Sequence, residues 1–369
     1  MELKRKEPKE IKRLLAMRFS AMGDVAMTVP VLTQLARQHP DLRITMLTRK
    51  KFLPLFEWVP SNVEVKGIDL ANYKGLLGLE RLFSMLHKQG FDAVADLHDV
   101  LRTKYLHNRF RMTSARVAVI DKGRKLKREI LGHGTDHDPL PSMFERYADV
   151  FRQLGLSLEL HPDEPIIDLK NEDFLPITRF AGKKEPGERW IGIAPFAAHD
   201  PKMYPLYMMG DVIALCTEYG YKVFLFGAGD KEAAQLERFE DENVKSICRR
   251  LCGLHDELLL MSRLDLMLCM DSANMHMAAM LGVPTLSIWG ATHPSAGFLP
   301  WNTTRADIIE LTDLPCRPCS VYGNKTCKLK DLRCMTQITP DIVADRIVEK
   351  LVGNITKKSR VRRMWRLFP

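Results

Sequence analysis

The chain has 369 residues, 46% of them hydrophobic, and 55 Lys and Arg against 46 Asp and Glu give it a net charge of +9. This length exceeds the usual size of one hydrophobic core and predicts two domains. No apolar run approaches the ~20 residues that cross a bilayer, and glutamates interrupt the basic N-terminus, so the pattern excludes a membrane-spanning protein and argues against a signal peptide. We therefore expect a cytoplasmic protein.

The first predicted strand, residues 14–17, ends in a polar turn that contains Ser20, Gly23 and Asp24. The next helix is marked by apolar residues on one face, namely Val29, Val31, Leu32 and Leu35. In open α/β sheets, ligands bind beyond the carboxyl ends of the strands. Asp24 is therefore a candidate general base, and the alternative interpretation is a cap of the following helix.

A strongly basic segment follows the predicted strand at residues 93–97. Residues 102–128 contain ten Lys and Arg and one acid, Asp121, whereas the rest of the chain is much less basic. Such local charge favours a specific anionic partner over a general field. The alternative is an ordinary solvated face.

Polar and Pro/Gly-rich residues near positions 172–188 predict the domain boundary. We expect an N-terminal domain at 1–175, a linker at 176–188, a second domain at 189–338, and a C-terminal helix and tail at 339–369. Predicted strands at 43–48 and 93–97 precede the linker, and others at 190–194, 222–226, 266–270 and 285–289 follow it. Strands alternating with helices predict parallel sheets in both domains.

Two loops of the second domain have the composition of a phosphate-binding site. Asp271 to His276 lie between a buried strand and a helix, where free backbone N–H groups and the helix dipole hold anions. Lys202 follows the strand at 190–194 and would neutralise diphosphate charge without a metal ion. The alternatives are a capped helix with no ligand and a solvated surface lysine.

Several motifs in this order resemble glycosyltransferase family 9, the ADP-heptose:lipopolysaccharide heptosyltransferases. They are Ser20-x-x-Gly23-Asp24-Val25, Lys202-x-x-Pro205, the Gly227 and Gly229 turn, and Asp271-Ser272-x-x-x-His276. The resemblance spans roughly residues 11–352. It implies a GT-B fold, with two Rossmann-like parallel-sheet domains facing a cleft, a C-terminal helix and a basic amphipathic tail. It further implies inverting, metal-independent transfer of a sugar, with heptose from ADP-heptose expected, to a lipopolysaccharide core or related glycolipid.

The resemblance also implies roles for individual residues. Asp24 becomes the general base, and Lys202 becomes the cation on the donor phosphates. The donor site would contain Ala197, Ala198, Lys202, Gly227, Glu232, Leu251, Gly253, Asp271, Ser272, Ala273 and His276. From its charge and its place after the strand at 93–97, we expect the basic segment to contact the acceptor, in a site with Ser20, Gly23, His98, Arg102, Arg124, Lys125 and Lys127. Ala273 stands where many members have glycine, which leaves room for a different nucleotide or sugar.

Four of the eight cysteines are closely spaced at Cys316, Cys319, Cys327 and Cys334. This spacing suits tetrahedral zinc, which would be structural because the implied catalysis needs no metal. Disulfides do not persist in the cytoplasm, so the alternatives are a redox-sensitive thiol cluster and packed cysteines.

The last residues of the chain have the pattern of an interfacial helix. Val361, Met364, Trp365 and Phe368 recur at helical spacing among six basic residues from Lys357 onward. We expect this tail to touch the cytoplasmic face of the inner membrane. The alternatives are a disordered basic tail and a helix packed on its own protein.

Other classes of function remain open from sequence. The cysteine cluster and basic segment are compatible with a zinc-knuckle nucleic-acid-binding protein, but no aromatic array accompanies the basic run, and we expect no nucleic-acid partner. Gly227-x-Gly229 after a strand is a weak signal for a dinucleotide-dependent oxidoreductase. A nucleotide- or sugar-binding module without catalysis is the third alternative.

Overall fold

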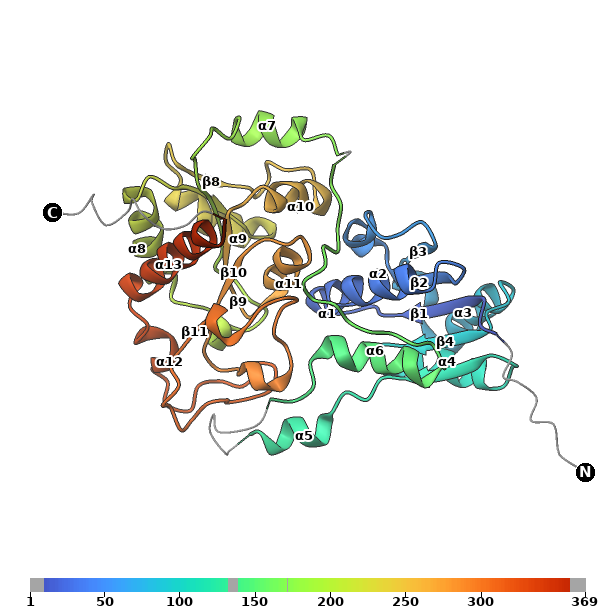
Figure 1. The fold of residues 1–369 in the computed structure, drawn as a ribbon. Helices are drawn as coiled ribbons and strands as arrows, with labels where there is room; N and C mark the ends of the chain where they lie inside the picture. The colour runs from blue at the N-terminus through green and yellow to red at the C-terminus, as the bar shows by residue number, and fades with distance from the viewer. Residues whose placement is uncertain (1–9, 132–138, 171, 359–369) are drawn as a thin grey trace, which may run out of the picture. The chain divides into compact units, whose positions relative to one another are not determined.

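The protein contains two compact units, each built around one parallel sheet (Figure 1). The computed structural model describes residues 10–131, 139–170 and 172–358. The first unit comprises the described residues up to Lys122 together with Met143–Ile166. The second comprises the described residues of Gly123–Ser142 and those from Ile167 onward.

The sheet of the first unit has five strands in the order β3-β2-β1-β4-β5. The strands are β1 (Arg13–Met17), β2 (Arg43–Arg49), β3 (Val63–Ile68), β4 (Ala93–Asp96) and β5 (Arg116–Val119). All neighbours are parallel, and Leu14 of β1 pairs with Ile44 on one side and Ala93 on the other. The chain moves outward from β1 to β3 and then returns to the other side of β1 with β4. The topological switch point of this sheet therefore lies between β1 and β4.

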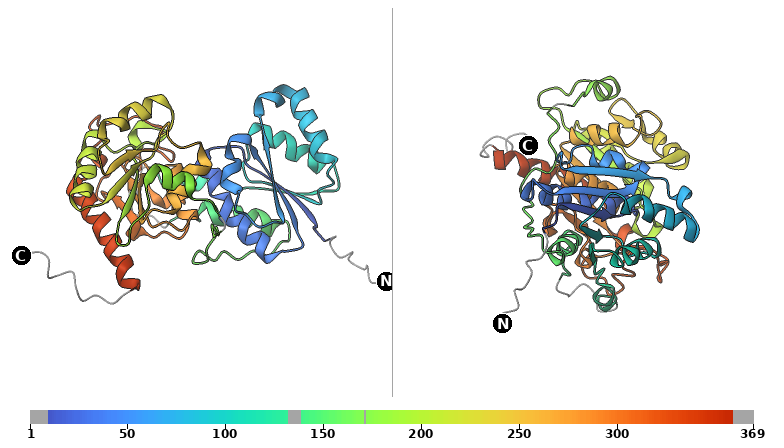
Figure 2. Two further views of the ribbon diagram at one scale, coloured as in Figure 1. Left: turned by 90° about the horizontal axis from the view of Figure 1, so that it is seen from above. Right: turned by 90° about the vertical axis from the view of Figure 1, so that its right-hand side faces the viewer.

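Helices cover both faces of the first sheet (Figure 2). They are α1 (Met22–Ala26), α2 (Thr28–Gln38), α3 (Gly75–His87), α4 (Leu101–Arg111) and α6 (Met143–Gln153), with the 3₁₀ helices η1 (Lys50–Phe56) and η2 (Leu70–Tyr73). Helices α2 and α6 pack together on one face, and α3 and α4 pack together on the other. On the α3 and α4 face, Leu15 and Met17 lie in one apolar cluster with Leu82, Leu106 and Phe110. This burial fixes β1 at the centre of the unit.

The sheet of the second unit has six strands in the order β11-β10-β9-β6-β7-β8. They are β6 (Trp190–Ala194), β7 (Lys222–Leu225), β8 (Val244–Ser246), β9 (Leu266–Met270), β10 (Thr285–Trp289) and β11 (Ile308–Glu310). All pairs are parallel. The chain runs outward from β6 to β8 and then returns beside β6 with β9, so this sheet has its switch point between β6 and β9.

The helices of the second unit also cover both faces of its sheet. They are α5 (Arg124–Glu129), α7 (Leu175–Ala181), α8 (Leu206–Glu218), α9 (Gly229–Leu236), α10 (Leu254–Ser262), α11 (Ala273–Met280), α12 (Arg333–Thr336) and α13 (Pro340–Lys358), with η3 (Asp200–Lys202), η4 (Glu237–Phe239), η5 (Pro294–Ala296) and η6 (Arg305–Asp307). Helices α8 and α13 contact each other and share an apolar cluster with β6, β7, β9 and β10. Helix α10 contacts both α11 and α7.

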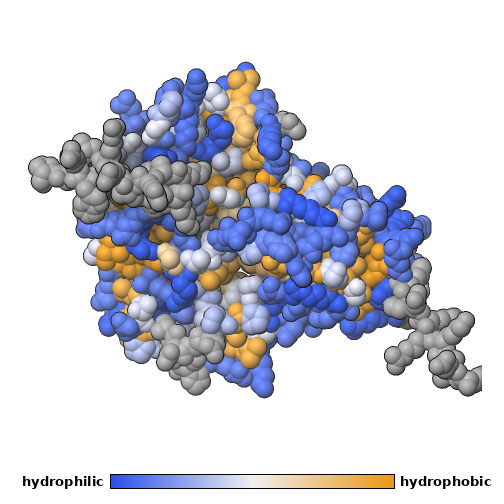
Figure 3. All heavy atoms as spheres, in the orientation of Figure 1, coloured by the Kyte–Doolittle hydropathy of each residue, from blue (hydrophilic) through white to orange (hydrophobic). Residues whose placement is uncertain are grey.

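The predicted α/β class with two parallel sheets is confirmed, and each strand that we expected is present within one or two residues. The boundary between the two compact units falls after residue 166, whereas the sequence predicted a first domain of 1–175. Residues 123–142, within that predicted domain, belong to the second unit. The expected linker also contains most of α7. On the face in Figure 3, hydrophilic residues predominate and apolar residues form scattered patches. Among the described helices, none has an apolar stretch long enough to cross a membrane.

Candidate active site

The turn that carries Asp24 lies at the switch point of the first sheet. Residues 18–24 follow β1, and residues 97–100 follow the neighbouring strand β4. Ser20 Oγ lies 3.2 Å from His98 Nε2, which joins the two loops directly. Three residues of the predicted acceptor site, Ser20, Gly23 and His98, therefore belong to the same edge of the sheet as Asp24.

Asp24 lies in the first turn of α1, and its two carboxylate oxygens are in different environments. Oδ2 accepts the backbone N–H of Ala21 at 3.0 Å and pairs with Arg18 Nη2 at 2.8 Å. Among the described residues, Oδ1 has no hydrogen-bond partner. The helix-cap interpretation thus holds in part, because Asp24 does cap α1 through Oδ2. The arrangement still leaves one oxygen to accept a proton from a ligand.

Arg18 holds the carboxylate in place from a buried position. It is 5% exposed, and its Nη1 donates to the carbonyl of Leu97 at 2.5 Å. Its guanidinium lies 5.7 Å from the ring centroid of Tyr147, whose hydroxyl donates to the Asp24 carbonyl at 3.2 Å. Burial raises the pKa of Tyr147, so its hydroxyl remains a donor. Side chain and main chain of Asp24 are therefore both fixed.

His98 is neutral at pH 7 in this environment. Burial and the positive charge of Arg18 lower the pKa of His98 to about 4. Its Nδ1 accepts the backbone N–H of Phe19 at 3.4 Å, so the ring proton lies on Nε2 and is donated to Ser20 Oγ. The hydroxyl proton of Ser20 is then available to a ligand beside Asp24.

A buried carboxylate shapes the loop that carries His98. Asp96 Oδ1 accepts the backbone N–H groups of His98 and Asp99, each at 2.9 Å, and its Oδ2 lies 2.8 Å from His107 Nδ1. Burial opposes ionisation of Asp96, but hydrogen bonds from His107 and from the loop outweigh it and lower its pKa. The charged Asp96 therefore holds the loop in a shape that aims the His98 ring at Ser20.

Lys202 and Asp271 meet at the switch point of the second sheet. Lys202 follows β6 and Asp271 follows β9, and their Nζ and Oδ2 atoms are 2.8 Å apart. Thr292, in the loop after β10, donates its hydroxyl to the same oxygen at 2.8 Å. Both charged side chains are about nine-tenths buried. An ion pair at this edge of the sheet holds the lysine beside the start of α11.

The first turn of α11 has the properties of an anion site. Ser272 is the N-cap residue, but no side chain caps the helix, and the buried Ser272 Oγ has no hydrogen-bond partner in the described structure. The N–H groups of the first turn have no acceptor within a helix, and the helix dipole is positive there. His276 lies in the same turn and is 6% exposed. With Lys202 nearby, this group of donors fits a diphosphate.

Gly323, which the sequence did not single out, packs against Lys202. A Cβ atom at Gly323 would lie 2.3 Å from Lys202 Cγ, and the residue has a φ of 74°. Only glycine fits both the conformation and the space. The loop between Cys319 and Cys327 therefore sets the position of the lysine, although a glycine in such a loop carries no distinguishing sequence signal.

The other predicted donor residues lie at the same edge of the second sheet. Ala197 and Ala198 follow β6, Gly227 and Glu232 follow β7, and Leu251 and Gly253 follow β8. Glu232 Oε2 accepts the backbone N–H of Ala228 at 2.7 Å, so this carboxylate stabilises the start of α9. Ala273 is the first residue of α11.

The basic segment at 102–128 is divided between the two units. Arg102 belongs to α4 of the first unit. Arg124, Lys125 and Lys127 belong to α5, which is part of the second unit. Arg124 and Lys125 are exposed. Lys127 is only 3% exposed, and its ammonium lies 4.2 Å from the ring centroid of Phe298. The cation–π contact accounts for the burial of Lys127, and its role in acceptor binding stays a prediction.

All four cysteines of the predicted zinc site have free thiols. In the described part of the chain, no three or more His, Cys, Asp or Glu side chains are grouped to hold a metal ion. Burial raises the pKa of Cys334 to about 11. At Cys327 burial also opposes ionisation, but N–H groups of residues 329–332 outweigh it and lower the pKa of the thiol. Structural zinc stays a prediction, which elemental analysis of protein purified without chelator would test.

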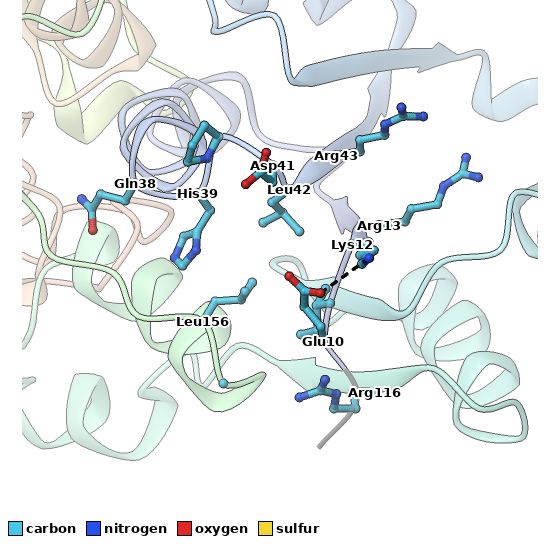
Figure 4. A pocket seen from close by; sticks show the side chains of 13 residues that line it. Glu10, Lys12, Arg13, Gln38, His39, Asp41, Leu42, Arg43, Arg116 and Leu156 are labelled. Carbon is cyan, nitrogen blue, oxygen red and sulfur yellow. Dashed lines mark ion pairs between the residues drawn. The ribbon is translucent and has the colours of Figure 1, made fainter. Parts of the chain in front are cut away.

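A cavity of about 990 Å³ lies at the opposite, amino edge of the first sheet (Figure 4). Its polar side chains are largely engaged: Lys12 pairs with Glu10 at 3.6 Å, and His39 Nε2 lies 2.6 Å from the carbonyl of Ser157. Arg13 and Arg43 extend away from His39 (Figure 4). The cavity is thus separate from the predicted site. The amphipathic pattern at 361–368 lies outside the described residues.

Comparison with known proteins identifies the family. The model of glycosyltransferase family 9 (heptosyltransferase) matches residues 79–330. Lipooligosaccharide heptosyltransferase 2 of Campylobacter jejuni is 25% identical over 88% of this chain and 93% of its own length. Lipopolysaccharide heptosyltransferase 1 of Pseudomonas aeruginosa is 26% identical over 92% of this chain and 98% of its own length.

Solved structures agree on the fold. A glycosyltransferase family 9 protein from Veillonella parvula superimposes with a TM-score of 0.70 at 19% identity, covering 94% of this chain and 99% of that one. The Escherichia coli heptosyltransferase WaaC, solved with ADP-2-deoxy-2-fluoro heptose, gives a TM-score of 0.62 at 17% identity, covering 91% and 99%. The predicted GT-B-like fold is thereby established, and the three alternative functions are set aside. The chain belongs to glycosyltransferase family 9, the heptosyltransferase family.

Proposed function

We propose that this glycosyltransferase moves heptose from ADP-heptose to a lipopolysaccharide-core acceptor, with inversion at the sugar and without a metal ion. One observation carries the proposal. Within the described residues, the first switch point holds a carboxylate with one unpaired oxygen, and the second holds a lysine beside a helix N-terminus that no side chain caps. A proton acceptor and an anion site are the two groups that such a transfer needs.

The choice of donor and acceptor rests on the relatives. WaaC was solved with an ADP-heptose analogue, and the curated relatives are named as lipopolysaccharide and lipooligosaccharide heptosyltransferases. Ser272 Oγ, the amides of Ser272 to Met275 and Lys202 would hold the diphosphate of such a donor. Inner-core saccharides are anionic, and Arg102, Arg124 and Lys125 supply cations for them.

The chemistry follows from the two groups. Asp24 Oδ1 takes the proton of an acceptor hydroxyl, whose oxygen attacks the anomeric carbon of the donor from the face opposite the diphosphate. The bond from the anomeric carbon to the diphosphate oxygen breaks, and its electron pair leaves with ADP. Lys202, His276 and the first turn of α11 stabilise the charge that develops on this leaving group. Ser20 donates a hydrogen bond to the acceptor and positions it beside Asp24.

A binding and transfer experiment tests the proposal. Thermal-shift titrations with ADP, UDP, GDP and CDP are run in EDTA and again with magnesium, because a ligand of the native state raises apparent stability. We expect stabilisation by ADP in both buffers. Mass spectrometry should then detect heptose on a deacylated core acceptor after incubation with ADP-heptose in EDTA. Stabilisation by a different nucleotide, or transfer that needs magnesium, would contradict the donor or the metal-free mechanism.

A further inference from the structure

Helices α3 and α4 contact each other on one face of the first sheet (Figure 2), and they run in the same direction because each returns from a strand of one parallel sheet. The rings of Phe83 and Phe110 contact edge to face at 5.1 Å. Nearer the start of each helix, Glu80 of α3 accepts a hydrogen bond from Tyr105 of α4. Glu80 also pairs with Arg109 of α4 at 2.7 Å. The first turns of both helices are therefore neighbours. Because α3 follows β3 and α4 follows β4, these turns lie at the carboxyl edge of the sheet, as Asp24 does.

These two first turns expose large apolar side chains. Leu101 is 86% exposed and Leu77 is 83% exposed, the highest values for large apolar residues in the described chain, and Leu76 is 67% exposed. The apolar tip, as we call Leu76, Leu77 and Leu101, is not needed for packing, since the buried face of α3 is formed by Leu82, Phe83 and Leu86. Clustered exposed leucines mark an interaction surface more often than scattered single ones do.

Positive charge surrounds the apolar tip. Lys74 precedes α3, Arg81 lies one turn after Leu77, and Arg102 follows Leu101. Within the described residues, none of these three cations has an ion pair or side-chain hydrogen bond. The nearby acids are already engaged, Glu80 by Arg109 and Asp99 by Lys104 at 3.5 Å. The surface therefore presents leucines within a ring of unbalanced cations.

We propose that the apolar tip docks the enzyme on an anionic lipid bilayer, with the three leucines in the acyl boundary and Lys74 and Arg81 at the headgroups. This inference rests on the proposed function, in which the acceptor is a glycolipid. A lipid surface is favoured over a protein because leucines flanked by cations match an apolar layer under anionic headgroups. Docking at the carboxyl edge would bring the acceptor sugar to the edge that carries Asp24.

Vesicle binding by the full chain tests the proposal. Sedimentation with phosphatidylglycerol and phosphatidylethanolamine vesicles is compared for the wild type and the triple variant Leu76→Gln, Leu77→Gln, Leu101→Gln. We expect at least a tenfold loss of partitioning in the variant. The matched control is Met112→Gln, at the other end of α4, where the side chain is 76% exposed. The control should bind as the wild type does, and unchanged binding by the triple variant would overturn the proposal.

Charge and catalysis are tested separately. The variant Lys74→Gln, Arg81→Gln should lose about fivefold in partitioning per cation at low salt, since each basic residue near anionic lipid contributes ~1 kcal/mol. The leucine variant should turn over a vesicle-embedded acceptor slowly but a deacylated, soluble acceptor at the wild-type rate. Equal loss on both acceptors would place the leucines in catalysis and overturn docking.

Two further outcomes keep the proposals distinguishable. If the leucine variant binds vesicles normally but changes the mass of the protein in light scattering, the apolar tip is an interface between copies of the chain and the docking inference is wrong. If the wild type transfers no heptose to any acceptor yet binds vesicles through the leucines, the proposed function fails and the lipid surface stands.

Discussion

The two sheets use the same topology to prepare different chemistry. At the switch point of the first sheet, Arg18 and Ala21 occupy one oxygen of Asp24, and His98 orients Ser20. At the switch point of the second sheet, Lys202 is held by Asp271, and the part of the chain that the structure describes gives Ser272 Oγ no partner and α11 no side-chain cap. In our proposal the first site is a fixed proton acceptor with few open groups, and the second is a set of donors that a ligand completes. The same fold thus places loops at the carboxyl edge of both sheets. The buried side chains that contact these loops decide which chemistry each edge supports.

The sharpest test of this comparison is Asp24→Asn. The amide keeps the shape of the side chain but cannot take the acceptor proton, so we expect kcat to fall by about 10²- to 10⁴-fold. Calorimetry should give an unchanged Kd for ADP, because Asp24 does not belong to the donor site. Wild-type turnover in the variant would show that Asp24 is only a helix cap.

Lys202→Met tests the second site. Loss of a charge-assisted hydrogen bond costs about 1.5–3 kcal/mol, which weakens ADP binding by about 10- to 100-fold. The control is Lys231→Met, at an exposed position in α9. If both variants bind ADP equally well, Lys202 serves only to neutralise Asp271.

Gly323→Ala should act on the donor site from the cysteine-rich loop. The new Cβ would collide with Lys202 Cγ and displace the ammonium, so we expect ADP affinity to fall about tenfold, or ~1.4 kcal/mol. Gly220→Ala is a matched control because its φ is 77° and nothing lies within 4 Å of the added atom. Both variants should lose ~1–2 kcal/mol of stability from left-handed strain. Equal ADP affinities of the two variants would show that the loop does not set the position of Lys202.

The smallest expected effect concerns His98 and pH. The pKa of His98 is about 4 in the folded protein and ~6.5 in the unfolded chain, so the unfolded state binds more protons between these values. The free energy of unfolding should therefore fall as the pH drops from ~6.5 toward 4, with a slope of at most ~1.4 kcal/mol per pH unit from this group. Urea titrations of His98→Gln should show a smaller slope than the wild type, and the exposed-site control His199→Gln should not. Parallel curves for the wild type and His98→Gln would mean that folding does not lower the pKa of His98.

Regular local patterns made much of the fold predictable. Buried strands such as Leu266–Met270 are continuous apolar runs, and in the helix after each strand the apolar residues recur at helical spacing. The strand Val63–Ile68 was not anticipated, because it is an edge strand with Glu64 and Lys66 in a half-exposed run. The short strand Val244–Ser246 gives too few residues for a period.

The site could be predicted only where its residues lie in local motifs. Asp271 directly follows a predicted strand, and Asp24 and Lys202 lie in the segments after two others, which places all three at the edges where such sheets bind ligands. Tyr147 donates a hydrogen bond to Asp24, which is 123 residues away, and Thr292 donates one to Asp271, which is 21 residues away. No sequence pattern connects either residue to its partner. The burial of Lys127 could not be predicted for the same reason, since it depends on a contact with Phe298.

By itself the sequence determined the strand and helix order, the two parallel sheets and the loops that carry chemistry, because periodicity and turn composition are properties of neighbouring residues. Tertiary structure decided which oxygen of Asp24 lacks a partner among the described residues, that His98 is neutral, that Gly323 packs against Lys202 and that Leu76, Leu77 and Leu101 are exposed. These features depend on burial and on contacts between distant segments, and such contacts exist only once the chain has folded.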